Sequence, residues 1–313
     1  MLPAPVLPLA PSGRQVRLSA HGQTAVVVEV GGGLRDYRVD GRPVLDGYAE
    51  DEACSGGRGL PLVPWPNRLA GGRYAFDGQE HVLPLDEPER PNAMHGLARS
   101  VSWTPVDVAE DRVTMSVTLW PRHGWPFTLS VSVEYALGPA GLVVTTVAEG
   151  TGAGAVPYAC GHHPYLTVGT PTVDEAELHL AARTWLPTDG DQIPTGREDV
   201  AGSPLDFRSP APVGDVRMDH AFTDLARGAD GRAAAVLRNP ADGREAELWV
   251  DGAYGWLEVF TGDALPQPGR RRRGLAVEPM TAPPNALQTG EDVVRLEPGE
   301  THAARWGIVP TGW

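Results

Sequence analysis

The stretch RVTMSVTL at Arg112–Leu119 alternates apolar and polar residues, and two similar runs follow it closely. These are TLSVSVEY at Thr128–Tyr135 and LVVTTV at Leu142–Val147. All three are rich in Val and Thr and are bounded by Gly, Pro or Asp, which is typical of strands joined by turns. Because the connections between them are short, the three runs predict an antiparallel meander.

The same strand pattern recurs along the rest of the chain. Further runs are TAVVVEV at Thr24–Val30, AELWV at Ala246–Val250 and WLEVF at Trp256–Phe260. The 38 Gly and 31 Pro supply frequent breaks, and no amphipathic helix of three turns is evident. We therefore predict an all-β antiparallel sandwich built from two large sheets. No segment has the composition of a linker, so we predict a single domain over residues 1–313.

Composition restricts the partners and the compartment. The chain has 26 basic residues, all of them Arg, against 40 acidic ones, and its net charge is −14. Nucleic acid is therefore a poor partner, because it requires a basic face. No apolar run of 18 residues predicts a membrane span, and Met1–Gln15 is broken by prolines and lacks the charged start of a signal peptide. We expect a cytoplasmic protein with no membrane partner.

Two segments in the first third of the chain carry side chains suited to a polar ligand. PWPNRLAGGRYAF at Pro64–Phe76 presents Arg68, a planar donor fork, between turn residues. PNAMHGL at Pro91–Leu97 presents His95 next to a glycine, which permits close approach of a ligand. Taken alone, Arg68 is better explained as an exposed loop residue and His95 as a structural donor.

A pair of adjacent histidines stands out in VPYACGHHPYL at Val156–Leu166. Neighbouring residues of an extended segment point to opposite faces, so at most one of His162 and His163 faces a given cleft. Cys160 lies nearby, but Cys-Gly-His-His offers too few ligands at unsuitable spacing for zinc. We therefore predict no metal site.

Carboxylates appear in two later segments. Asp219 lies in RMDHAF at Arg217–Phe222, and Glu278 follows an apolar strand in GLAVEPMTAPPNAL at Gly274–Leu287. A carboxylate at such a position acquires a raised pKa if it is buried, although for a glutamate taken alone a strand-end residue facing water is the better interpretation. The run RRRR at Arg270–Arg273 suits either a phosphate grip or a solvated turn, and we favour the turn.

The chain lacks the signatures of several common kinds of catalysis. It contains no serine nucleophile elbow, no phosphate-binding P-loop, no dinucleotide GxGxxG after a strand and no HExxH. What remains is a set of His, Asp, Glu and Arg residues spread along the chain. This set favours proton transfer over covalent or redox chemistry.

Taken together, these segments resemble the aldose 1-epimerase (galactose mutarotase) family. The matching stretches occur in the family's order between about Leu60 and Leu287, and they are PWPNRLAGGRYAFDG, NAMHGL, CGHHPYL, WLPTDGDQIPTGREDVAGSPLDFR, MDHAF and VEPMTAPPNAL. The resemblance implies a large antiparallel β-supersandwich with a cleft for one monosaccharide and no cofactor.

The resemblance also implies a role for each matching residue. Asn67 and Arg68 match the family's substrate-binding Asn-Arg pair, and Asp219 matches the aspartate that binds a sugar hydroxyl. His95 matches the first active-site histidine. His163, rather than His162, occupies the place of the catalytic histidine.

Glu278 matches the family's catalytic base. The family's mechanism then implies that Glu278 is a carboxylate that accepts the proton of the C1 hydroxyl. It also implies that His163 is an imidazolium that protonates the ring oxygen. Opposite charges placed nearby favour both of these charged states. We expect Trp65 or Tyr165 to form an aromatic platform under the sugar. The residues after the base, Pro279–Thr281, differ from those of galactose-type members, which leaves the sugar open.

The resulting hypothesis is an enzyme that interconverts the anomers of a free aldohexose, as a monomer or a homodimer. One alternative is a hexose-6-phosphate 1-epimerase, which requires a basic pocket such as Arg270–Arg273 or Arg73 near the cleft. A second is a sugar-binding protein without catalytic activity on the same fold.

Overall fold

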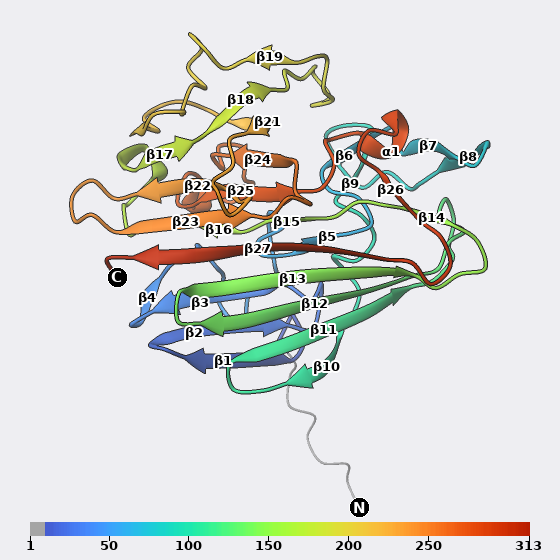
Figure 1. Ribbon diagram of the computed structural model, residues 1–313, viewed down its shortest axis with the longest axis horizontal. Coiled ribbons are helices and arrows are strands. Elements are labelled where there is room, and N and C mark those ends of the chain that lie inside the picture. The colour runs from blue at the N-terminus through green and yellow to red at the C-terminus, as the bar shows by residue number, and fades with distance from the viewer. Residues whose placement is uncertain (1–9) are drawn as a thin grey trace, which may run out of the picture.

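The predicted meander forms three of the nine strands of the larger of two main sheets in the computed structural model, which describes residues 10–313. Strands β11 (Arg112–Leu119), β12 (Leu129–Gly138) and β13 (Gly141–Gly150) pair in antiparallel register, which confirms the meander. The last strand, β27 (Thr301–Thr311), lies beside β13 near the middle of the sheet (Figure 1).

The strands assemble into two large sheets and four small ones. The nine-stranded sheet has the order β10 (Thr104–Val108), β11, β12, β13, β27, β23 (Glu245–Val250), β22 (Ala233–Arg238), β17 (Glu177–Leu180) and β20 (Ala211–Pro212). The eight-stranded sheet has the order β19 (Glu198–Asp199), β18 (Ala182–Trp185), β21 (Asp219–Leu225), β24 (Trp256–Phe260), β25 (Leu275–Met280), β15 (Gly161–His162) and β5 (Pro61–Leu62), with β16 (Tyr165–Leu166) beside β25.

The smaller sheets and the few helical turns complete the described chain. A four-stranded sheet contains β1 (Gln15–Ala20), β2 (Gln23–Val28), β3 (Leu34–Val39) and β4 (Arg42–Pro43). The two-stranded pairs are β14 (Val156–Tyr158) with β26 (Val294–Leu296), β6 (Arg68–Ala70) with β9 (Asn92–Met94), and β7 (Arg73–Phe76) with β8 (Gln79–Val82). The helical turns are η1 (Val173–Glu175), η2 (Pro268–Arg270) and α1 (Ala286–Thr289). The predicted all-β class with two large sheets is confirmed.

Side-chain alternation explains how the nine-stranded sheet packs. Along β12 every second residue is buried, including Val131, Val133 and Tyr135, and the residues between them are partly exposed. This period of two gives the sheet one core face and one face toward solvent. The Tyr135 hydroxyl donates a buried hydrogen bond of 2.8 Å to the Gly32 carbonyl, which ties the meander to the segment between β2 and β3.

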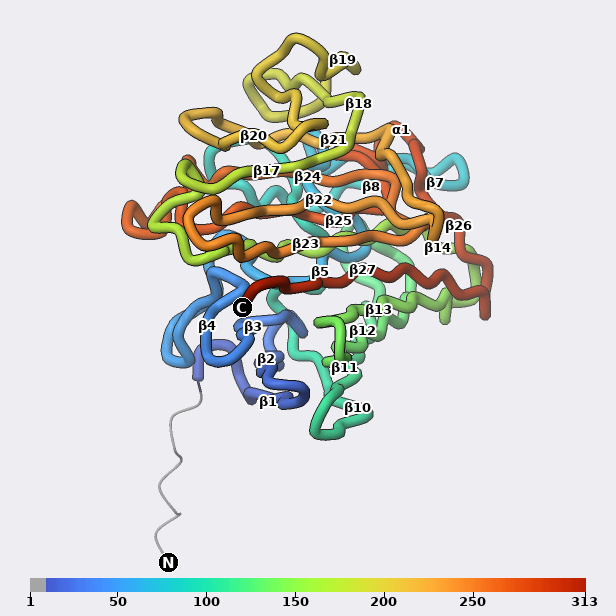
Figure 2. The backbone as a smooth tube through the Cα atoms, turned by 60° about the vertical axis from the view of Figure 1, so that its left-hand side comes forward, coloured from blue at the N-terminus to red at the C-terminus, as the bar shows by residue number. Residues whose placement is uncertain are grey.

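The central strands of the eight-stranded sheet are buried on both faces, and this arrangement positions the candidate site. In β24 and β25, Leu257, Val259 and Val277 belong to the main hydrophobic core. Residues at the intervening positions point to the other face, where Glu258 and Glu278 lie. Figure 2 shows β22 and β23 of the larger sheet running across β24 and β25.

Two expectations concern parts of the chain that the structure describes incompletely or not at all. The N-terminal segment for which we predict no signal peptide falls largely within residues 1–9, outside the described residues. Among residues 10–313, no helix has both the length and the apolar character needed to cross a membrane. The main core contains residues from Leu18 to Ile308, and the single-domain organisation stays a prediction.

Candidate active site

Two buried carboxyl groups lie side by side on the outer face of the eight-stranded sheet. Glu278 of β25 is directly opposite Glu258 of β24 in the antiparallel register. Each residue is only 2 % exposed. Within residues 10–313, the Oε2 atom of each carboxyl group has no hydrogen-bond partner. Buried polar atoms in native proteins nearly always have partners, so this pair marks a place where a polar ligand can bind.

His163 supplies the closest partner of Glu278. Its Nε2 atom is 3.2 Å from Glu278 Oε1, and both side chains are buried. The neighbouring His162 points the other way, where its Nε2 atom is 2.7 Å from the hydroxyl of Thr146 on β13. The prediction that the two histidines face opposite sides is therefore confirmed. It is His163 that shares a face with Glu278.

The ring of His163 is held by two close contacts. Tyr165 stacks on it, with ring centroids 4.9 Å apart and planes 7° from parallel. Gly57 approaches its edge so closely that a Cβ atom on this glycine would be 2.7 Å from His163 Cδ2. The loop that carries Gly57 thus depends on the missing side chain to let the histidine lie where it does.

His95 and Asn67 form a second, mutually supporting unit. Both have left-handed backbones, with φ of 59° and 54°, which is uncommon for residues other than glycine. The His95 N–H donates to the Asn67 carbonyl at 2.8 Å, and the Asn67 N–H donates to His95 Nδ1 at 3.2 Å. Because Nδ1 accepts, the ring proton is on Nε2, which makes His95 a neutral donor. The His95 ring is 5.3 Å from that of His163.

Arg68 links this unit to the carboxylates. Its Nε atom donates to both oxygens of Glu87, at 3.1 and 3.2 Å, and its Nη2 atom is 3.6 Å from Asp219 Oδ2. The Arg68 side chain is 8 % exposed, whereas that of Asp219 is 30 % exposed. The structure therefore brings these two predicted binding residues together, with Asp219 as the more accessible of the two.

The two aromatic residues predicted as a platform differ in position. Trp65 lies in the main core, with its ring 6.4 Å from that of Trp125. Tyr165 stacks on His163 and also lies under the guanidinium of Arg58, whose Cζ atom is 4.5 Å from the ring centroid. Tyr165 therefore lies in the site, whereas Trp65 lies in the main core. A platform role for either ring stays a prediction.

The electrostatic environment of the central pair differs from the expected pair of opposite charges. Burial, helped by the nearby Arg58 guanidinium, lowers the pKa of the His163 imidazole to about 3. Burial and the Asp219 carboxylate raise the pKa of Glu278 well above its usual range, while Arg68 acts in the opposite direction. Both directions favour the uncharged forms. The expected imidazolium–carboxylate state is therefore not the resting preference of this environment.

Three residues of the site were missed in the sequence. Glu258 lies within WLEVF, and a charged residue inside such an apolar run is a signal that could have identified it. Burial, followed by the charges of Asp219 and Glu278, raises the pKa of Glu258 well above its usual value. Glu87 and Arg58 lie in loops whose local sequence gives no comparable signal.

A cavity of about 620 Å³ lies next to residues that neighbour the two histidines, although neither histidine lines it. Its lining includes Gly57, which touches His163, and Gly96, which follows His95. No group of three or more His, Cys, Asp or Glu side chains in the described chain is arranged to hold a metal ion. The four arginines of Arg270–Arg273 direct their hydrogen bonds and ion pairs to other parts of the chain.

Comparison with known proteins identifies the family. The aldose 1-epimerase family model matches residues 14–308. This chain belongs to the aldose 1-epimerase family. It is 34 % identical to the uncharacterized protein YihR of Escherichia coli K12 over 298 residues, covering 95 % of this chain and 93 % of the relative. It is 28 % identical to rat galactose mutarotase over 303 residues, covering 89 % of this chain and 85 % of that protein.

Solved structures agree on the fold. The aldose epimerase homologue from C. elegans superposes with a TM-score of 0.85 at 19 % identity, covering 96 % of this chain and 99 % of the other. Galactose 1-epimerase from Lactobacillus acidophilus gives a TM-score of 0.77 at 19 % identity, with 94 % and 92 % covered. The galactose mutarotase-like fold implied by the resemblance is confirmed.

The first prediction tests the contact between Gly57 and His163. Gly57→Ala introduces a Cβ atom 2.7 Å from His163 Cδ2 at a residue with φ of +67°. We expect the histidine to be displaced from Glu278 and any catalysis that uses this contact to fall by about 10²-fold, since misplacement of about 1 Å can have this effect. Gly78→Ala is the control, because it also has positive φ but nothing within 4 Å of the added atom. Equal activity of the two variants would contradict this role of Gly57.

The second prediction separates the adjacent histidines. Burial lowers the pKa values of both His162 and His163 to about 3, so the unfolded chain gains protons first as the pH falls below about 6.5. Both histidines therefore reduce stability progressively between about pH 6.5 and pH 3. His162→Gln and His163→Gln should each flatten the fall in melting temperature over this range.

Activity at neutral pH should distinguish the same two variants. The His163 variant should lose any catalysis that uses the contact with Glu278, whereas the His162 variant should retain most of it, because only His163 contacts Glu278. An equally deep loss in both would show that the opposite orientation of the rings has no functional meaning.

The third prediction concerns the protonation of Glu258. Its raised pKa means that the folded state keeps a proton that the unfolded state loses above about pH 4.5, so this residue costs increasing stability as the pH rises. Glu258→Gln should therefore raise the melting temperature more at pH 8 than at pH 5. The exposed Glu80→Gln is the control and should show no such difference. A smaller gain in melting temperature at pH 8 than at pH 5 would contradict the raised pKa of Glu258.

Proposed function

We propose that this chain is an aldose 1-epimerase that interconverts the α and β anomers of a free aldohexose without a cofactor. The observation that carries the proposal is the buried contact of 3.2 Å between His163 Nε2 and Glu278 Oε1, with the His95 ring beside it. An acid and a base held together in this way match the requirement of mutarotation, which needs one proton removed and one delivered.

The proposed roles of His163 as the acid and Glu278 as the base are compatible with the uncharged forms that burial favours at rest. An imidazolium with a carboxylate and an imidazole with a carboxylic acid contain the same number of protons. They differ only in the position of one proton between His163 Nε2 and Glu278 Oε1. A sugar in the site adds hydroxyl groups that hydrogen-bond to the charged forms, and this favours the ion pair. The oxygen atoms of Glu278 and Glu258 that have no partner are the natural acceptors for these hydroxyls.

The reaction then proceeds in balanced steps. Glu278 accepts the proton of the C1 hydroxyl while His163 protonates the ring oxygen. The bond between C1 and the ring oxygen breaks, and the open-chain aldehyde forms. Rotation about C1–C2 and reclosure on the other face return both protons. Each positioned acid or base contributes on the order of 10²–10⁴ in rate.

The surrounding residues hold the sugar and steady its charge. His95, as a neutral Nε2–H donor, would bind an oxygen near the reacting centre. Asp219 and Arg68, with Asn67 beside them, would bind hydroxyls elsewhere on the ring, where bidentate and charge-assisted hydrogen bonds give orientation. Tyr165 would act mainly by holding His163 in place. We propose the monosaccharide as the partner of this site, in a monomer or a homodimer.

The fourth prediction tests the base. Glu278→Gln keeps the size of the side chain but removes the proton acceptor, so mutarotation should fall by at least about 10²-fold. Polarimetry of freshly dissolved α-galactose and α-glucose measures the rate, and circular dichroism checks the fold. Glu80→Gln, exposed on β8, serves as the control. A Glu278 variant that keeps more than a few per cent of the rate would exclude Glu278 as the base.

The same assay distinguishes the two alternatives. A wild-type protein that binds galactose in calorimetry but accelerates no anomerisation would be a non-catalytic binding protein. A rate on glucose 6-phosphate well above that on glucose would indicate a hexose-6-phosphate 1-epimerase. The relatives named galactose mutarotase make galactose the first sugar to test.

A further inference from the structure

A second cavity, of about 720 Å³, has a lining dominated by arginines. It shares no lining residue with the site described above. Its charged lining comprises five arginines and three carboxylates, which are Arg17, Arg35, Arg38, Arg270, Arg273, Asp36, Asp46 and Glu52. In a chain with a net charge of −14, this concentration of positive charge is local and unusual.

Two of the five arginines have carboxylate partners of their own. Arg17 pairs with Glu50 at 2.9 Å, and both side chains are exposed, so this pair contributes little to the field in the cavity. Arg38 pairs with Asp36 at 2.8 Å through Nε and donates to the Gly41 carbonyl through Nη1. Among residues 10–313 its Nη2 atom makes no hydrogen bond, so Arg38 keeps a donor for an anion beside the remaining arginines.

Asp46 is shared by three guanidinium groups. Its carboxylate oxygens are 3.3 Å from Arg58 Nη2, 3.5 Å from Arg270 Nη1 and 3.8 Å from Arg273 Nε. Glu52 takes a further bond from Arg270 at 2.7 Å. Two carboxylates, Asp46 and Glu52, face three guanidinium groups, so this wall of the cavity carries an excess of positive charge.

Arg35 stands opposite this wall and has no carboxylate partner in the described chain. The residue is only 8 % exposed. Its Nε atom donates to the Gln15 side chain at 2.8 Å and its Nη1 atom donates to the Tyr48 carbonyl at 2.6 Å. Among residues 10–313, no hydrogen bond involves its Nη2 atom. A buried guanidinium with neutral partners and a spare donor is costly unless an anion compensates it.

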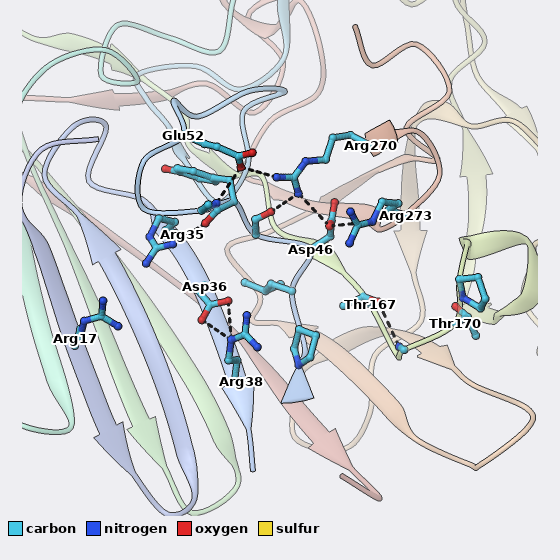
Figure 3. Close-up of a pocket in the computed structure, with 17 residues that line it drawn as sticks. Arg17, Arg35, Asp36, Arg38, Asp46, Glu52, Thr167, Thr170, Arg270 and Arg273 are labelled. Atoms are coloured by element: carbon cyan, nitrogen blue, oxygen red, sulfur yellow. Dashed lines mark hydrogen bonds and ion pairs between the residues drawn. The ribbon is translucent and has the colours of Figure 1, made fainter. Parts of the chain in front are cut away.

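Figure 3 shows how these groups face each other across the cavity. Arg35 and Arg38 lie on the side of the four-stranded sheet, and Arg270 and Arg273 lie on the side of η2. The Arg273 side chain is 54 % exposed and makes no hydrogen bond within the described residues, so its donor fork is available. The interpretation of Arg270–Arg273 as a solvated turn is wrong for Arg270 and Arg272, whose side chains are only 20 % and 15 % exposed.

We propose that this cavity binds a small molecule that carries two phosphate groups, one held by Arg35 and Arg38 and the other by Arg270 and Arg273. Guanidinium groups bind phosphate oxygens through paired, charge-assisted hydrogen bonds. The volume lies within the usual range for small-molecule sites. A ligand with two anionic ends matches arginines on two opposite walls better than a single anion does.

Isothermal titration calorimetry of the full chain at low ionic strength tests the fifth prediction. The probes are inorganic phosphate, glucose 6-phosphate, glucose 1,6-bisphosphate and ADP. Glucose 1,6-bisphosphate or ADP should bind at least about tenfold more tightly than either monophosphate, because a second phosphate adds charge-assisted bonds. Added salt should weaken the binding. The comparison of the sugar bisphosphate with ADP distinguishes separated from adjacent phosphates.

Arginine variants test whether the binding occurs in this cavity. Arg273→Gln and Arg38→Gln are exposed enough to leave the fold intact, and each should weaken binding by about tenfold. Arg112→Gln on β11 is the matched control, because it is similarly exposed and has Asp107 as its neighbour. The proposal is overturned if no probe binds, if inorganic phosphate binds as tightly as the bisphosphate, or if the cavity variants behave like the control. The epimerase proposal does not depend on any of these outcomes, because it rests on the contact between His163 and Glu278, neither of which lines this cavity.

Discussion

Placing two carboxyl groups opposite each other inside a sheet is the constraint around which the site is organised. Glu258 and Glu278 occupy register partners on adjacent strands that are buried on both faces. Neither strand can shift by one residue to expose its carboxyl group, because such a shift would also turn Leu257, Val259 and Val277 out of the core. The apolar residues therefore hold the acids in place, and the acids must be compensated where they stand.

The side chains that offset the two buried carboxyl groups lie outside the strands of the eight-stranded sheet. Arg68 offsets the carboxylates only in part, because Glu87 already binds its Nε atom. His163 approaches Glu278 from the segment between β15 and β16, where Gly57 leaves room for its ring. The result is a group in which protonation, rather than a full set of opposite charges, offsets part of the cost of burial. This property is also what a site for proton transfer requires.

The sequence predicted the fold well because its strands alternate regularly. Residues Arg112–Leu119 and Trp256–Phe260 are strands with the boundaries expected from the pattern, and the meander follows from short connections. The opposite orientation of the His162 and His163 side chains also followed from the two-residue alternation of an extended segment. The run Trp256–Phe260 predicts a strand but not the function of Glu258, because its pairing with Glu278 depends on the register between β24 and β25. Arg58 and Glu87 could not be found, since their positions depend on contacts with Tyr165 and Arg68 made only in the folded chain.

The two sites are physically connected, although they share no residue. Asp46 lines the arginine-rich cavity and bonds Arg58, Arg58 lies over the Tyr165 ring, and Tyr165 stacks on His163. Each contact in this series involves a residue that is at most 8 % exposed. The carboxylate that partly neutralises the cavity also holds the guanidinium that helps to lower the pKa of His163. Because Asp46 is shared among three arginines, any anion that engages Arg270 or Arg273 leaves more of its charge for Arg58. The same buried carboxylate therefore contacts both the arginines of the cavity and the guanidinium that lies over Tyr165, whose ring stacks on that of His163.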